Sequence, residues 1–410
     1  MRFSIFRILT PVLFALMLFS CENPDEKVFA AFDVYCEMVV NGAKPMALHY
    51  PMEPKEVDKL WGQFQERAEK HNVKIFKEEN FPVTLLFPSE ATLGKSVVII
   101  HKGDRLIQYE QFKSDLEAYK DKDPKQLEAF ARRFGRLLGY STQGINELLQ
   151  KNTPYRNLAS FGVRRQLTHL YYENPTEASS FYQNTLGLTP LDSSQFAIGS
   201  NASIELHGFD EKHDRDQSKS TAIALLTDQL SEWYDHLQTK GVPVKYPYKK
   251  RDGGPHDGFV IVDPGGYLLE FEQFKQHPEN ELFMAALAQC DPVETEVDSL
   301  NFYASITWTY HKDLLRMQKF YEEILGFQLV ADQVWTKIYQ TSSSGFIGLV
   351  DERRGMQNYA DDKAVKIEWQ LSDWGDFDRY AKKFWQEYAY RNSSFKGPEN
   401  YMFDIEAIGE

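Results

Sequence analysis

Two short segments place reactive side chains at the alternating spacing of a β-strand. Glu205 and His207 lie two residues apart, as do Glu270 and Glu272. In a strand, residues two apart share one face, so each pair would point to the same side. Imidazole and carboxylate groups that converge on one point bind Fe(II), Mn(II), Ni(II) or Zn(II), or transfer protons. A polar pocket without metal would use the same residue types.

The elements around these residues belong to an internal repeat. Segments Asn174–Leu188 and Asp313–Phe327 both begin with a helix-capping Asn or Asp, then carry Phe-Tyr, three residues, Leu-Gly and an apolar residue. In each segment the glycine is the left-handed residue that ends a helix, and Phe, Tyr and Leu form its buried stripe. The segments start 139 residues apart, too far for a solenoid repeat. The sequence therefore indicates a duplicated domain.

The first of these helices lies within a cycle of one strand, one helix and three strands, and a second cycle follows it. For the first cycle we expect strands at 166–172, 196–198 and 203–207. For the second we expect a strand at 221–226, a helix at 230–239 and strands at 242–247, 259–262 and 267–274. Asp-Pro-Gly-Gly at 263–266 predicts a tight turn between the last two strands.

A separate folded region, 28–150, and a linker, 151–162, precede these cycles. This region is an α/β or α+β domain that the sequence alone does not assign to a known fold. Its periodicity predicts helices at 54–72, 106–119 and 126–138, a last helix ending at 149, and strands at 83–87 and 96–101.

Composition limits the class of protein. The chain has 410 residues, of which 42% are hydrophobic and 26% charged, so it can form several globular domains. Its net charge of −14 and its lack of a basic run argue against nucleic acid as a partner. The sequence does not indicate an oligomeric state.

The N-terminus reads as a targeting segment. Arg2 and Arg7 flank an apolar run, 8–19, that is too short to span a bilayer, and a polar stretch follows Cys21. Residues 1–20 resemble a bacterial lipoprotein signal peptide. The resemblance implies a lipid on Cys21, a tether at 21–27 and a membrane as partner. It places the protein in the cell envelope, and Glu22 favours the outer membrane.

The repeated motifs resemble a known superfamily. Phe-Tyr-x3-Leu-Gly and the later Asp-Pro-Gly-Gly-Tyr-Leu-Leu-Glu-Phe are similar to motifs of the vicinal oxygen chelate superfamily, which includes glyoxalase I, extradiol dioxygenases and bleomycin-resistance proteins. The resemblance implies an α+β fold in which two βαβββ repeats pair to form a cup. We expect one such domain at 163–276, a linker at 277–299 and a degenerate second domain at 300–410. Repeats one and two would form the first cup, and repeats three and four the second.

The same resemblance suggests a ligand set for the first cup. Glu205 and Glu270 match the family's two glutamate ligands and would also be the catalytic residues. His169 is an imperfect match for the histidine of the first strand, and His207 shares the face of Glu205. These four residues are the candidate metal ligands. The residues expected to line the cup are Tyr171, Phe196 and Tyr267.

The second cup lacks these ligands. Trp308 takes the place of His169, Gly348 takes that of Glu205, and Lys366 or Ile367 opens the fourth repeat. Only Glu406 could serve as the closing carboxylate, and a single carboxylate does not hold a divalent metal in water. We therefore expect a packing or ligand-binding role for this half.

Three functional hypotheses follow from the sequence. In the first, the cup binds a small oxygenated or amphipathic molecule without metal. In the second, a divalent metal makes the protein a lyase, isomerase or dioxygenase. In the third, the tandem domains are a scaffold for protein contacts at the cell envelope. The superfamily includes proteins with and without catalysis, so fold analogy does not choose among them.

Overall fold

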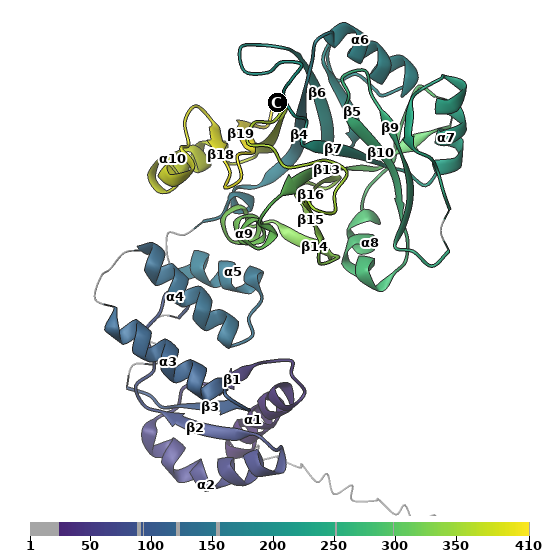
Figure 1. Ribbon diagram of the computed structural model, residues 1–410. Coiled ribbons are helices and arrows are strands. Elements are labelled where there is room, and N and C mark those ends of the chain that lie inside the picture. Colours follow the sequence, from purple (N-terminus) through teal and green to yellow (C-terminus); the bar gives the residue numbers. More distant parts are fainter. Residues whose placement is uncertain are drawn as a thin grey trace, which may run out of the picture. The chain divides into compact units, whose positions relative to one another are not determined.

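The computed structural model describes residues 24–87, 92, 94–119, 124–152, 156–250, 252–297 and 299–409. The chain divides into two compact units, Met1–Ser141 and Thr142–Glu410 (Figure 1). Helix α5, Thr142–Asn152, was predicted at the end of the first region but belongs to the second unit. The predicted domain boundary at 150 is therefore wrong by one helix.

The N-terminal predictions fall largely outside this description. The signal peptide at 1–20 and Cys21 lie outside the described residues. Residues 24–27, predicted as part of the tether, begin helix α1. Among the described residues, no helix combines the length and apolar character that crossing a bilayer requires.

The first unit packs helices against a three-stranded antiparallel sheet of order β1-β3-β2. The central strand is apolar and fully buried, as expected for a strand covered on both faces. The predicted strand at 83–87 is wrong, because that segment is irregular and Val83 is 65% exposed. The elements are α1 Pro24–Val40, β1 Met46–Leu48, α2 Pro54–Lys70, β2 Lys74–Glu78, β3 Val97–His101, α3 Arg105–Ala118 and α4 Pro124–Leu137.

The second unit contains all four repeats. Repeat one comprises β4 Val163–Tyr172, α6 Pro175–Ser180, η3 Phe181–Thr185, β5 Gln195–Gly199 and β6 Ala202–Gly208; repeat two comprises β7 Thr221–Leu226, α7 Leu230–Thr239, β8 Val244–Tyr246, β9 His256–Val262 and β10 Leu268–Phe274. Repeat three comprises β13 Ala304–His311, α9 Leu314–Lys319, η5 Phe320–Leu325, β14 Gln328–Asp332, β15 Thr336–Gln340 and β16 Gly345–Asp351; repeat four comprises β17 Val365–Leu371, α10 Trp374–Phe384, η6 Gln386–Tyr388, β18 Ser394–Lys396 and β19 Met402–Ala407.

Short elements join the repeats. They are η2 Leu158–Phe161 before repeat one, and η4 Pro278–Asn280, α8 Glu281–Leu287, β11 Val293–Glu294 and β12 Asn301–Phe302 between repeats two and three. The predicted linker at 277–299 is therefore partly structured, and Phe283 of α8 is fully buried.

The duplicated helix motif has the predicted ends. The side chains of Asn174 and Asp313 accept hydrogen bonds from the backbone N–H groups of Glu177 and Arg316, so each caps its helix. Gly326 and its counterpart in repeat one have φ angles of +75° and +62°. Each helix ends in a turn of π-helix, which stops at Thr185, two residues before Gly187, and at Leu325, directly before Gly326.

The pairing of repeats differs from the prediction. One sheet has six strands in the order β18-β19-β17-β4-β6-β5, and the other has eight in the order β14-β15-β16-β13-β7-β10-β9-β8. Strand β4 pairs antiparallel with β17, and β7 with β13. Repeat one therefore shares a sheet with repeat four, and repeat two with repeat three. The predicted domains 163–276 and 300–410 are not separate, because each contributes half of both sheets.

Two tyrosines connect the sheets in equivalent ways. The hydroxyl of Tyr267 in repeat two accepts from the backbone N–H of Tyr171 at 2.8 Å and donates to the carbonyl of Ala364 at 2.6 Å. The hydroxyl of Tyr401 in repeat four accepts from the N–H of Tyr310 at 2.7 Å and donates to the carbonyl of Ser220 at 2.6 Å. Each hydroxyl thus bridges two strands of the opposite sheet.

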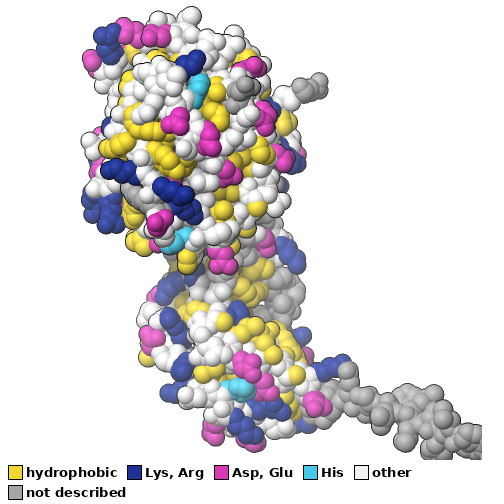
Figure 2. All heavy atoms as spheres, turned by 90° about the vertical axis from the view of Figure 1, so that its right-hand side faces the viewer, with side chains coloured by type: hydrophobic (Ala, Val, Ile, Leu, Met, Phe, Trp, Pro, Cys, Tyr) yellow, Lys and Arg dark blue, Asp and Glu magenta, His cyan; other side chains and the backbone are white. Residues whose placement is uncertain are grey.

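The two sheets bury different residues on their cup faces. In the six-stranded sheet, alternate residues of β4 and β17, such as Leu170 and Ile367, face the main core, and the polar residues between them face the cup. In the eight-stranded sheet, Ile306, Trp308 and other apolar side chains fill the corresponding face. Acidic and basic side chains are interspersed over the face of the molecule shown in Figure 2.

Candidate metal centre

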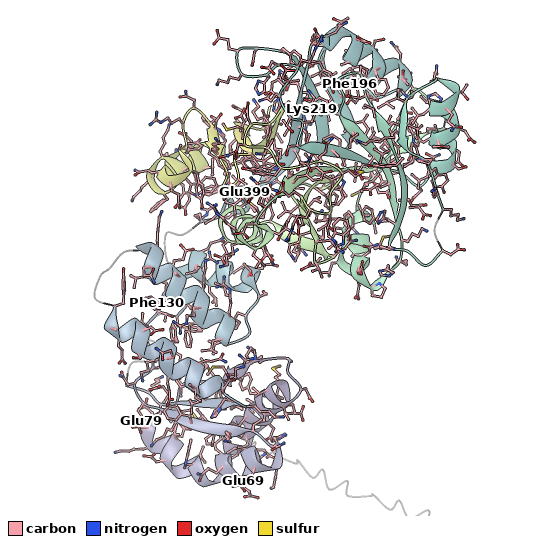
Figure 3. The ribbon with its side chains drawn as sticks, in the orientation of Figure 1. Glu69, Glu79, Phe130, Phe196, Lys219 and Glu399 are labelled. Atoms are coloured by element: carbon pink, nitrogen blue, oxygen red, sulfur yellow. The ribbon has the colours of Figure 1, made fainter. Side chains whose placement is uncertain are left out.

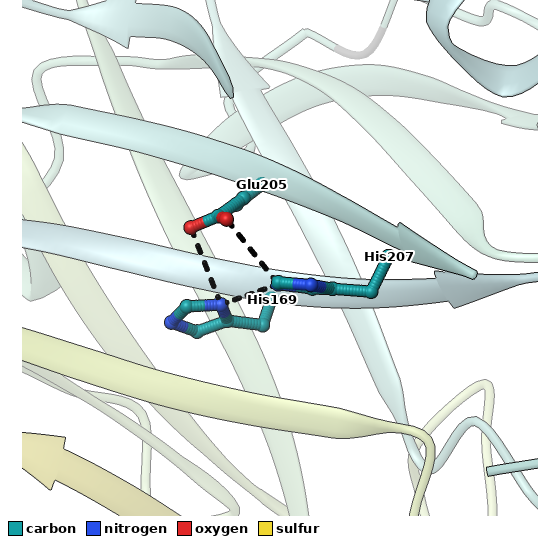
Figure 4. Close-up of side chains that lie close together, drawn as sticks. All are labelled: His169, Glu205 and His207. Atoms are coloured by element: carbon teal, nitrogen blue, oxygen red, sulfur yellow. Dashed lines mark hydrogen bonds and ion pairs between the residues drawn. The ribbon is translucent and has the colours of Figure 1, made fainter. Parts of the chain in front are cut away.

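A cluster of two histidines and one glutamate lies on the cup face of the six-stranded sheet. Strands β4 and β6 run parallel, and His169 is in register with Glu205. His207 follows two residues later on β6 and therefore shares the face of Glu205. Figure 4 shows the three side chains converging from these two neighbouring strands. Three of the four ligands proposed from the sequence are thus brought together.

The ligand atoms of this cluster are close to one another. His169 Nδ1 and His207 Nε2 are 2.8 Å apart. The carboxylate oxygens of Glu205 lie 3.6 Å from His169 Nδ1 and 3.7 Å from His207 Nε2. One ligand atom from each residue lies within 4.8 Å of the other two. Within the described ranges, no other group of three His, Cys, Asp or Glu residues meets this spacing.

Glu368 lies behind His169 and was not predicted from the sequence. Its Oε2 atom is 3.3 Å from His169 Nε2, which is the ring nitrogen that points away from the cluster. Gln370 donates a hydrogen bond of 3.0 Å to the other oxygen of Glu368. Both residues are on β17, in repeat four. The sequence shows that they alternate with the apolar residues Ile367 and Trp369, which are buried. It does not show that β17 pairs with β4, and only this pairing brings Glu368 next to His169.

The same face carries additional charges from repeat four. Lys366 is opposite His169 in register, and its ammonium group is 2.5 Å from Asp404 on β19. Glu406 follows two residues later on β19. Arg165 of β4, in register with Gln370, is on this face too, so two basic side chains accompany the four carboxylates of Glu205, Glu368, Asp404 and Glu406. This face therefore attracts cations.

Burial and neighbouring charges determine the protonation states at the site. Burial raises the pKa of Glu205, although the charge of His169 opposes the shift. Burial lowers the pKa of His207 to about 4, and the charges of His169 and Lys366 act in the same direction. His207 is thus neutral at pH 7, which is the form that binds metals. Burial alone would raise the pKa of Glu368, but the neighbouring His169 and the hydrogen bond from Gln370 lower it overall.

The cluster is accessible from one side only. The side chains of His169 and Glu368 are 4% and 11% exposed, whereas those of Glu205 and His207 are 26% and 32% exposed. A small molecule would therefore approach over Glu205 and His207. Tyr171 borders this approach, because its ring stacks on His213 at 3.5 Å and lies 5.3 Å from the ring of His207.

Three other predicted site residues lie elsewhere. Glu270 is on β10, in the eight-stranded sheet, so it does not join His169. Phe196 (labelled in Figure 3) belongs to the main core, where its ring stacks on that of Tyr182. Tyr267 is fully buried and forms one of the two inter-sheet bridges. The prediction put Glu270 in the same cup as His169 because it paired repeat one with repeat two, whereas repeat one pairs with repeat four and repeat two with repeat three; we call this observed arrangement the exchanged pairing.

The residues of the cluster fit a divalent transition metal. Two ligand atoms bound to the same ion at about 2.0–2.2 Å are separated by about 3 Å, close to the distance between the two histidine nitrogens. A metal-binding histidine normally donates its other ring N–H to a carboxylate, and Glu368 is in that position behind His169. Among the described residues, the buried Nε2 atom of His169 makes no hydrogen bond of good geometry, and the carboxylate of Glu368 lies 3.3 Å from it.

Comparison with known proteins matches part of the chain to one superfamily. The profile of the Glyoxalase/Bleomycin resistance protein/Dioxygenase superfamily matches residues 165–271. No curated protein matches the chain. Glyoxalase I from Zea mays is 16% identical, covers 60% of this chain and 92% of its own, and has a TM-score of 0.40. A virulence protein from Salmonella typhimurium is 21% identical, covers 27% of this chain and 94% of its own, and has a TM-score of 0.22.

Proposed function

Because residues 165–271 belong to the Glyoxalase/Bleomycin resistance protein/Dioxygenase superfamily, we propose that the cup of the six-stranded sheet binds one divalent transition metal. Its ligands would be His169, Glu205 and His207. The observation that carries the proposal is the position of Glu368 behind a ligand cluster of two imidazoles and one carboxylate. This ligand set suits Fe(II), Mn(II), Ni(II) or Zn(II).

We propose that the cup acts on a small oxygenated molecule, as an isomerase, lyase or dioxygenase. A bound metal would polarise neighbouring oxygen atoms of the substrate and stabilise the negative charge that develops on them. Glu368 would orient His169 and keep its Nδ1 atom unprotonated. Burial and the charges of Glu368 and Asp404 raise the pKa of Glu406, so this carboxylate is suited to hold or release a proton on the same face.

A second candidate function is the binding of a small oxygenated or amphipathic molecule without metal. The hydrogen-bonding distance of 2.8 Å between His169 and His207 supports it, because one ring N–H can satisfy the other ring nitrogen when no ion is present. Tyr171 would then supply an apolar wall for the ligand.

Metal titration separates these candidates. We expect the chelator-treated protein to bind one equivalent of Fe(II), under anaerobic conditions, or of Mn(II), Ni(II) or Zn(II) in calorimetry. Glu205→Gln should abolish binding because a neutral amide is a poor ligand. Glu368→Gln should weaken it by about 10- to 100-fold, since it removes the carboxylate that orients His169.

The matched control is Glu270→Gln, which makes the same chemical change in the other sheet and should leave metal affinity unchanged. Equal losses in Glu205→Gln and Glu270→Gln would contradict the assignment of the site. A wild-type protein that takes up none of the four metals would favour the metal-free function.

We also propose that a lipid on Cys21 anchors the protein to the bacterial outer membrane. The apolar run at 8–19 followed by Cys21 supports this proposal. Cells fed a fatty-acid analogue should label the wild type, whereas Cys21→Ala should lose both label and membrane retention. Unchanged retention of Cys21→Ala would rule out the anchor.

A further inference from the structure

The eight-stranded sheet contains a separate cavity on its cup face. It has a volume of about 300 Å³ and is bordered by β8, β9, β10 and the segment that follows β16. Val260, Tyr246 and Met356 contribute apolar surface to its walls. Glu270 and Glu272, two residues apart on β10, both line it.

Glu272 is buried at this cavity without a satisfying partner. It is 6% exposed, and its Oε2 atom forms no hydrogen bond with good geometry. The indole of Trp308, which is 7% exposed, is close enough to Glu272 to lower the pKa of that carboxyl, but its N–H makes no hydrogen bond of good geometry. Buried polar atoms normally have partners, so these atoms indicate a ligand that is bound during function.

Two substitutions in repeat three fill the part of this cup next to Glu272. A Cβ atom at Gly348 would overlap the ring of Trp308, so only glycine lets the indole lie across β16. In the register of the two sheets, Trp308 pairs with Ala222 as His169 pairs with Lys366. The indole therefore occupies the part of this cup where the other cup carries its metal ligands.

The charges around the cavity leave the carboxylates in excess. His256 Nε2 is 3.9 Å from Glu272 Oε1, which is too far for a hydrogen bond. The carboxylate of Asp257 is paired with Lys275 at 2.6 Å. Lys249 is exposed at the rim. Burial raises the pKa of Glu270, and the charge of Glu272 adds to the shift; a cationic ligand would reverse both effects.

We propose that this cavity is a second ligand site, which binds a small organic cation through a protonated amino group held by Glu270 and Glu272. An ammonium group offers three hydrogen-bond donors and one positive charge, so it can bond to Glu272 Oε2 and balance one ionised carboxylate while the other carboxyl of the pair stays protonated. The apolar surface of Tyr246, Val260 and Met356 suits the carbon skeleton next to the ammonium. A divalent metal fits less well, because no third ligand completes a set at this position among the described residues.

The test uses the full chain, with benzylammonium and the uncharged benzyl alcohol as a matched pair of probes. The indole N–H resonance of Trp308, assigned by comparison with Trp308→Phe, reports binding inside the cavity in ¹⁵N NMR spectra at neutral pH. We expect benzylammonium to shift this resonance saturably, and benzyl alcohol to bind at least about tenfold more weakly. Glu270→Gln and Glu272→Gln, which preserve side-chain volume, should each lower benzylammonium affinity by about tenfold or more.

The proposal does not depend on the metal centre, so both Gln variants should keep metal binding in the first cup. The comparison of the two probes on the wild-type protein needs no variant to fold. The proposal is overturned if benzylammonium leaves the Trp308 resonance unshifted, if benzyl alcohol binds equally well, or if folded Gln variants retain full affinity.

Discussion

Replacing Tyr267 by Phe removes one hydroxyl from a fully buried bridge between the two sheets. Strand β17 is paired with β4 as far as Leu170 and Val365, and the next pair in register is Tyr171 with Ala364. The Tyr267 hydroxyl lies between these two residues and bonds to both. The substitution therefore removes the hydrogen bonds at the end of the β4–β17 strand pair, which joins repeat one to repeat four.

The expected cost follows from the groups left behind. The N–H of Tyr171 and the carbonyl of Ala364 each lose a buried partner, and an unsatisfied buried group costs about 1–3 kcal/mol. Some relaxation is expected, so the unfolding free energy of the second unit should fall by about 2–4 kcal/mol. For a unit of this size, that loss corresponds to a decrease in Tm of about 4–10 °C.

Differential scanning calorimetry of the full chain measures this loss as a shift of the transition of the second unit. Tyr401→Phe removes the equivalent bridge at Tyr310 and Ser220 and should cost a similar amount. Tyr234→Phe is the control, because its hydroxyl has no hydrogen-bond partner among the described residues; it should change stability by less than about 0.5 kcal/mol. If Tyr267→Phe lost no more stability than Tyr234→Phe, the bridge would not contribute to the pairing of the repeats.

Two further predictions concern the repeats and the second cup. A 21–275 fragment lacks β13 and β17, whose apolar side chains contribute about 1.5–3 kcal/mol each when buried. The fragment should therefore show no cooperative unfolding transition for the second unit. A sharp unfolding transition would refute the pairing of repeat one with repeat four and of repeat two with repeat three. Burial raises the pKa of Glu272 to about 8, although the nearby Trp308 indole opposes the shift, so the folded protein disfavours the ionised form. The unfolding free energy of the wild-type protein should thus decrease as the pH rises from about 4.5 to 8, and Glu272→Gln should flatten this decrease. Parallel pH profiles of Tm for the wild type and Glu272→Gln would argue against a raised pKa of Glu272.

Features that depend on local spacing could be predicted from the sequence. The caps Asn174 and Asp313 follow from residue type and position, and the structure confirms both. The convergence of His169, Glu205 and His207 followed from strand alternation, because the three residues lie on adjacent strands of one repeat. No partner from another repeat was needed to bring them together.

Features that depend on which strand edges meet could not be predicted. Each repeat leaves the edge of its first strand open, and the alternating patterns of β4, β7, β13 and β17 do not specify a partner. The sequence-based prediction paired neighbouring repeats, which placed Glu270 in the metal site and missed Glu368. Phe196 was misassigned for a different reason, within repeat one: it is in register with Ile204 on β6 and shares the core-facing side of that strand pair.

The exchanged pairing also explains why the two cups differ chemically. Asp404 and Glu270 occupy equivalent positions, because Asp404 is in register with Glu368 on β17 and Glu270 with Ala224 on β7. In the first cup Lys366 neutralises Asp404, while the ligands of repeat one remain available for a metal.

In the second cup the situation is reversed. Glu270 remains, but Trp308 and Gly348 replace the ligands that would accompany it. The first cup therefore has the ligands contributed by repeat one, whereas the second cup has only the closing carboxylate, Glu270. Among the described residues, His169, Glu205 and His207 form the group whose spacing suits a metal, whereas the second cup offers charge and apolar surface without such a group. Since the proposed metal site of the first cup includes Glu368 from repeat four, it would be complete only after the last repeat has folded against the first.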